Sequence, residues 1–229
     1  MSDPIETLSP VSEHMMSRRG FLAAAGVAGA GLALFSGAGI TLAAPSASQD
    51  LQIAQLAASL EVLAVNTYQA ALAAAGAGKL GTVPPAVATY VQTALAEHQY
   101  QLGTWNQVIT GAGKPAVDTP PADLNATVNQ MFGQVKDVTG AANLAQTLEQ
   151  IAADTYFTAV PNLESGAAIE MAGNYQIVDQ QHRAILLFVL GQYPVPDTFQ
   201  KGDKAYAPTG SVAGATTPAP VPAPVQAPM

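Results

Sequence analysis

The sequence predicts an all-α protein whose long helices form an antiparallel four-helix bundle. Four long stretches repeat apolar residues with helical spacing, and proline or glycine separates them from one another. Alternating β-branched runs bounded by hairpin turns are absent, which argues against a sheet. Because these stretches are rich in alanine and only 10% of the chain is charged, the helices are expected to pack closely side by side.

Each helix is delimited by breaking residues. The second begins after Pro84-Pro85 and ends at Gly111, the third is closed by Pro161, and the fourth is closed by Gly191. A shorter helix is expected in the long connection between the second and third. In chain order, the five helices are expected at about residues 50–75, 86–111, 122–138, 141–160 and 167–190.

Residues 1–44 have the layout of an export signal. Arg18 and Arg19 precede an uncharged stretch that ends in small residues. The run SRRGFL resembles the twin-arginine motif, although Ala23 stands where that motif often has lysine. The uncharged stretch is long enough to be a retained membrane anchor, but its glycine and alanine content favours a cleaved signal. We therefore expect export by the twin-arginine pathway to the periplasm, the cell wall or the exterior, with no membrane span after cleavage.

Residues 207–229 alternate proline with alanine, valine and threonine, a composition typical of an extended polyproline segment. This segment is either a disordered tail or a contact to the cell envelope. One domain, residues 46–206, remains between the signal and the tail.

Composition excludes several classes of function. The chain has no cysteine, so it has no disulfide, no thiol nucleophile and no thiolate metal site. Its net charge is −8 and it has no basic patch, so a nucleic-acid partner is not expected.

Rare polar residues lie on the apolar faces of the four long helices. A lone buried carboxylate costs several kcal/mol unless it is paired or bound to a metal. Several such groups converging inside one bundle therefore predict a shared polar site, although each alone could be a solvated helix edge or a surface hydrogen bond. The residues on these faces are Glu61, His98, Glu149, Asp179 and His182. Tyr68, Trp105, Tyr156 and Tyr175 have helical spacing and are interpreted as core filling, with tuning of redox chemistry near such a site as the alternative.

Three segments carry a family resemblance: LEVLAVNTY, LEQIAADTYFTAVPNL and, most specifically, DQQHRAILLFVLGQYPVPDTF. Through them, Leu51 to Phe199 resembles exported bacterial proteins of the ferritin-like superfamily, in the branch that includes desiccation-related proteins. The resemblance implies a ferritin-like bundle. Di-metal proteins of that superfamily take one Glu from each of two helices and a Glu-x-x-His pair from each of the other two.

By this resemblance Glu61 and Glu149 match the single glutamates of the first and third helices. Asp179 and His182 match the fourth-helix pair, with Asp in place of Glu. The second helix departs from the pattern, because Leu95 stands three residues before His98. The second-helix ligand is then His98, with Glu97 as a bridging or supporting group. This departure leaves two metals, one metal or none as alternatives.

The resemblance and the ligand types imply that the protein binds iron or manganese, before zinc, through mixed oxygen and imidazole ligands. A role in protection from oxidative or desiccation stress is the implied function. The alternative is a non-catalytic envelope protein that kept the bundle and lost the metal. No residue identifies a substrate, and a monomer or small oligomer is expected rather than a storage shell.

Overall fold

The computed structural model describes residues 49–206, and the expected export signal and Pro/Ala-rich tail lie outside the described residues. Within 49–206 the chain forms five α-helices, one short 3-10 helix and no strand, which confirms the all-α prediction. None of the helices in this range is long and apolar enough to cross a membrane. The elements are α2 (Gln49–Gly76), α3 (Pro85–Gly111), α4 (Ala122–Phe132), α5 (Val138–Ala159), η1 (Val160–Asn162) and α6 (Gly166–Val189).

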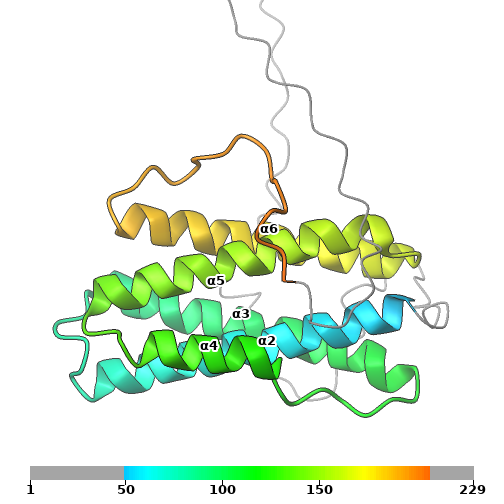
Figure 1. Ribbon diagram of the computed structural model, residues 1–229, viewed down its shortest axis with the longest axis horizontal. Coiled ribbons are helices and arrows are strands. Elements are labelled where there is room, and N and C mark those ends of the chain that lie inside the picture. Colours follow the sequence, from blue (N-terminus) through cyan, green and yellow to red (C-terminus); the bar gives the residue numbers. More distant parts are fainter. Residues whose placement is uncertain (1–48, 207–229) are drawn as a thin grey trace, which may run out of the picture. The chain divides into compact units, whose positions relative to one another are not determined.

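The four long helices pack in pairs. α2 lies along α3 and α5 along α6, while α2 also contacts α5 and α3 contacts α6 (Figure 1). The short helix α4 belongs to the connection between α3 and α5 and contacts α5. This arrangement turns one face of each long helix toward the same interior.

The structure corrects the connection between α4 and α5. Helix α4 ends at Phe132 rather than near residue 138, and α5 begins at Val138 rather than near residue 141. Asp137 explains the difference, because its backbone is extended and its carboxylate accepts the backbone N–H of Gly140 at 2.7 Å. An N-cap of this kind starts a helix, so the chain has to leave α4 before reaching it.

Two apolar clusters make up the core. One contains Trp105, Ile109, Tyr156 and Tyr175, and the other is built around Tyr68, Tyr90 and Leu186. Alanines fill much of the space between these larger side chains, which lets the helices approach closely. Buried polar residues connect the two clusters. Tyr68 of one and Tyr156 of the other donate hydrogen bonds to two different buried glutamates, and His98 is hydrogen-bonded to both of these glutamates.

A buried aspartate ties the beginning of α2 to the beginning of α6. The carboxylate of Asp50 accepts the backbone N–H groups of Glu164 and Ser165, each at 2.8 Å. A second buried aspartate, Asp154, holds the segment after α6 by accepting from Gln200 and from the backbone N–H of Lys204. Both carboxylates have hydrogen-bonded roles outside the site described next.

Candidate metal centre

Four of the six predicted site residues form one compact group. His98 of α3, Glu149 of α5 and the pair Asp179 and His182 of α6 each offer a ligand atom, and these atoms all lie within 4.8 Å of one another. All four side chains are buried. The i, i+3 spacing on α6 places Asp179 and His182 side by side, as the sequence predicts.

Glu61 of α2 is buried next to this group and contacts it through His98. The Nδ1 of His98 lies 2.8 Å from Glu61 Oε2, so a protonated Nδ1 donates to that carboxylate. The other oxygen, Oε1, accepts the hydroxyl of Tyr156 at 2.6 Å. With its amide nitrogen facing Glu61, Gln101 donates to both oxygens at 2.9 and 3.0 Å. The hydrogen-bonding capacity of Glu61 is therefore well used.

Glu97 occupies a different position from its neighbour in sequence. It lies about 100° around α3 from His98, and its side chain is 38% exposed. Its Oε2 is 2.6 Å from the Nε2 of His182, so Glu97 accepts a hydrogen bond from that imidazole at the edge of the group. Each of the two histidines thus has one ring nitrogen held by a glutamate.

Four of the atoms that face the interior of the group have no such partners. Neither oxygen of Asp179, nor Glu149 Oε2, nor His182 Nδ1 has a hydrogen-bond partner among the residues the structure describes. His182 Nδ1 lies 3.4 Å from Glu149 Oε2, and His98 Nε2 lies 3.2 Å from Glu149 Oε1. Asp179 is fully buried, and an ionised carboxylate without a partner is costly at such a place.

This set of atoms fits a metal ion. Ligands that share one ion at about 2.0–2.2 Å lie at most about 4.4 Å apart, so the observed spread needs only a small contraction. The glutamates hold the outer nitrogen of each histidine, which leaves the inner nitrogen free to coordinate when the ring is neutral. Carboxylate partners of this kind orient metal-binding histidines in many proteins.

Without a metal, protons and charges balance the group. Burial lowers the pKa of His182, but the charge of Glu149 and the hydrogen bonds to Glu149 and Glu97 together outweigh burial and raise that pKa to about 9. Burial also lowers the pKa of His98. The charges and hydrogen bonds of Glu149 and Glu61 outweigh burial and raise that pKa well above its usual value. Burial and the charge of Glu149 raise the pKa of Asp179. Burial also favours a higher pKa for Glu149, yet the two histidines hold it below its ordinary range.

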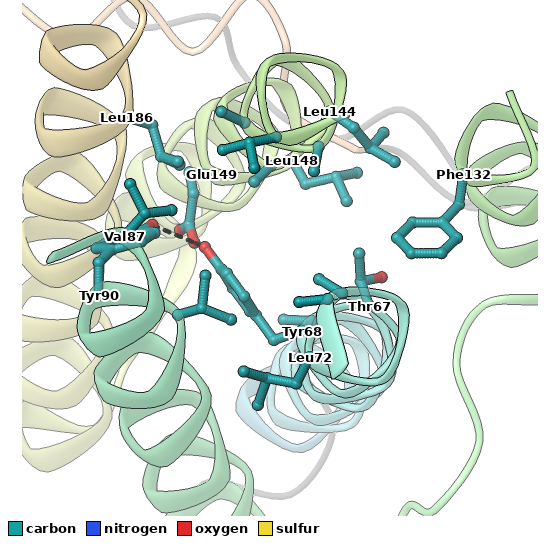
Figure 2. Close-up of a pocket in the computed structure, with 18 of the residues that line it drawn as sticks. Thr67, Tyr68, Leu72, Val87, Tyr90, Phe132, Leu144, Leu148, Glu149 and Leu186 are labelled. Atoms are coloured by element: carbon teal, nitrogen blue, oxygen red, sulfur yellow. Dashed lines mark hydrogen bonds between the residues drawn. The ribbon is translucent and has the colours of Figure 1, made fainter. Parts of the chain in front are cut away.

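The hydroxyl and amide groups around the site do more than fill the core, because they form hydrogen bonds with the buried glutamates. Tyr68 donates to Glu149 Oε1, and the hydroxyls of Tyr68 and Tyr90 are 2.8 Å apart (Figure 2). Tyr156 donates to Glu61 and accepts from the indole N–H of Trp105 at 2.8 Å. Sequence reasoning missed Tyr90 and Gln101 altogether. Helical spacing was a usable signal for Gln101, which follows His98 by three residues.

One comparison with known proteins found a match. The family model Ferritin_2, described as a ferritin-like domain, matches residues 49–192. No match was found among the curated proteins or among the solved structures. The matched range includes α2 to α6 and every residue of the candidate centre.

Proposed function

The chain belongs to the ferritin-like domain family, and from that premise we propose that it binds one iron or manganese ion through His98, Glu149, Asp179 and His182. One observation carries the proposal: four buried ligand atoms without hydrogen-bond partners belong to three of these residues, which lie in the same compact group. Two imidazoles and two carboxylates form a mixed donor set that suits these metals. When bound, such an ion supplies Lewis acidity or one-electron redox chemistry.

In this proposal Glu61 and Glu97 orient the ligands rather than bind the ion. Each holds the outer nitrogen of one histidine, His98 and His182 respectively. A hydrogen bond at the outer nitrogen fixes the tautomer, so that the lone pair of the inner nitrogen points into the group. The six residues predicted from sequence then divide into four ligands and two supporting carboxylates.

Further parts of the proposal rest on the sequence. We propose that the four long helices form an antiparallel ferritin-like bundle, and that the protein is exported by the twin-arginine pathway because of Arg18 and Arg19. A role in oxidative or desiccation stress follows from the resemblance of residues 179–199 to desiccation-related proteins. A monomer or small oligomer remains our expectation for the assembly.

Metal analysis tests the function directly. The protein is purified from its native compartment without chelators, because zinc and copper can displace weaker-binding metals during handling. We expect about one equivalent of iron or manganese per chain. Asp179→Asn should lose that metal, since the amide keeps the size of the side chain but not its charge.

Asp203→Asn is the matched control. It makes the same chemical change at an aspartate whose side chain is 61% exposed, and it should keep the metal. A wild-type content below about a tenth of an equivalent would instead support the metal-free envelope protein. Equal loss of metal from both variants would show that the group around Asp179 is not the site.

A further inference from the structure

An apolar cavity lies beside the candidate centre. It has a volume of about 240 Å³ and is lined by residues of α2, α3, α4 and α5, with Leu186 of α6 at one side. Figure 2 shows Leu72, Leu144, Leu148 and Phe132 around this space. Protein interiors contain few voids larger than a water molecule, so a cavity of this size is not ordinary packing.

Small and aliphatic side chains create the cavity. Ala71 of α2 and Ala145 of α5 line it where larger residues would fill it. Helix α4 contributes Leu124 and Phe132, which explains why this short helix has an apolar face although it has only one fully buried residue, Val128. Several lining side chains are half-buried rather than enclosed, so the cavity has access to solvent.

Polar groups gather at one place in its wall. Tyr68, Tyr90, His98 and Glu149 all line the cavity, and the first three surround or contact the glutamate. Tyr68 donates a hydrogen bond to Glu149, and its hydroxyl oxygen also lies 2.8 Å from that of Tyr90. A hydroxyl oxygen has two lone pairs, so with Tyr90 donating to one of them Tyr68 can still accept a hydrogen bond.

An apolar pocket with a few convergent polar groups is the usual form of a small-molecule site. From the cavity, its walls and its polar end, we propose that it binds an uncharged, mainly apolar small molecule. The polar end of the ligand lies at the hydroxyl of Tyr68, beside the candidate metal centre. An apolar cavity of about 150 Å³ can hold benzene, so this one fits a substituted benzene or an aliphatic alcohol of similar size.

The wall chemistry selects against charged ligands. No lysine or arginine lines the cavity, and the imidazole of His98 is already paired with Glu61 and Glu149, so an organic anion finds no unpaired cation there and faces Glu149. An ammonium group would have to lose its hydration among aliphatic side chains. The proposal does not depend on the bound metal, because the aliphatic walls and Tyr68 are present whether or not an ion is bound.

Calorimetric titration of the chelator-treated protein tests the proposal with four probes. We expect toluene and 1-hexanol to bind at one site, with dissociation constants on the order of 0.1 mM. Hexanoate and hexylammonium should bind at least about tenfold more weakly, because the walls offer no compensation for lost hydration. Absence of saturable binding by the neutral probes, or tighter binding by either ion, would overturn the proposal.

Two neighbouring alanines of α2 provide a matched pair of variants. Ala71 lines the cavity, whereas Ala70 does not, and both are half-buried. Ala71→Leu should weaken toluene binding by about tenfold or more because its added atoms occupy the ligand's space, and Ala70→Leu should not. Tyr68→Phe should weaken 1-hexanol by about fivefold, the ratio expected for one neutral hydrogen bond, while leaving toluene unchanged. Equal effects of the two leucine variants would contradict the assignment.

A measurement on the unmodified protein covers the case in which a variant fails to fold. Methyl resonances of Leu72 and Leu144, which line the cavity, should shift when toluene is added. Those of Ile177 and Ile185, which are exposed on α6, should remain in place. Larger shifts at the two isoleucines would show that the probe binds the apolar surface of α6, and would refute the cavity site.

Discussion

We expect the metal-free protein to lose stability as the pH rises from 6.5 to 9, whereas the stability of the metal-loaded protein stays nearly constant over the same range. The reason is that the same groups bind either protons or the ion. His182 has a pKa raised from 6.5 to about 9 in the folded protein, because the charge of Glu149 and the hydrogen bonds to Glu149 and Glu97 together outweigh the effect of burial. A raised folded-state pKa stabilises the fold below the unfolded value and loses that contribution as the pH passes the folded value.

The size of the effect follows from this shift. A rise from 6.5 to about 9 corresponds to about 3 kcal/mol for His182. The pKa values of His98 and Asp179 are also raised, so their contributions have the same sign. Glu149 has a lowered pKa, and its contribution is lost only when the pH falls below the carboxylate range, outside this window. For a domain of this size, about 3 kcal/mol lowers the melting temperature by about 6–12 °C.

A bound metal removes this pH dependence. Coordination requires neutral imidazoles and an ionised Asp179, so the ion has to displace the protons that stabilise the metal-free form. For each displaced proton, metal binding strengthens by about 1.4 kcal/mol per unit that the pH rises, as long as the pH is below the pKa of that group. This gain offsets the stability that the metal-free form loses. The stability added by manganese should therefore increase steeply between pH 6.5 and 9.

Urea denaturation followed by circular dichroism measures both curves, with a chelator in one series and excess manganese in the other. His182→Gln should reduce the loss of stability in the chelator series by about 3 kcal/mol, because glutamine does not titrate. A metal-free curve that is flat or rises with pH would refute the raised histidine pKa values. Parallel curves with and without manganese would show that these protonated groups are not the ligands.

Two further substitutions separate supporting roles from structural ones. Glu61→Gln should lower metal affinity by about 10- to 100-fold in a chelator competition, because it weakens the hydrogen bond that orients His98; unchanged affinity would contradict that role. Asp50→Ala should lower the free energy of unfolding by about 1–3 kcal/mol, measured by urea denaturation, because the backbone N–H groups of Glu164 and Ser165 lose their acceptor. Its metal content should not change, since Asp50 lies outside the centre.

Much of the fold could be predicted because residues close to the helix ends in the sequence determine where the helices begin and end. Pro85 starts α3 and Gly191 follows the end of α6, and these ends lie within about two residues of the expected ones. The prediction for residues 132–141 was wrong. Apolar residues continue past the end of α4, so periodicity favoured a longer helix there, whereas the cap formed by Asp137 decides the outcome.

The site was predictable as a set of residues and not as a set of roles. Helical periodicity predicted that Glu149, Asp179 and His182 face one interior, and the structure brings them together with His98. Periodicity does not tell which atom of each side chain is free. That depends on hydrogen bonds from distant residues, such as Tyr156 to Glu61, whose partners lie 95 positions apart. The cavity was also beyond prediction, because it depends on how four helices meet.

The hydrogen bonds of Glu61 also bear on whether one ion or two would bind. In the two-metal pattern of the superfamily, the first-helix glutamate is a ligand, and the second helix supplies a further carboxylate. Here Leu95 stands where that carboxylate would precede His98, and the amide of Gln101 faces Glu61 instead. Together with Tyr156 and His98, it gives Glu61 three donors, which a second ion would have to displace. Asp179 has no such donors. Hydrogen bonds therefore satisfy the half of the two-metal pattern around Glu61. Only the half around Asp179 has ligand atoms free for an ion, which favours a single ion.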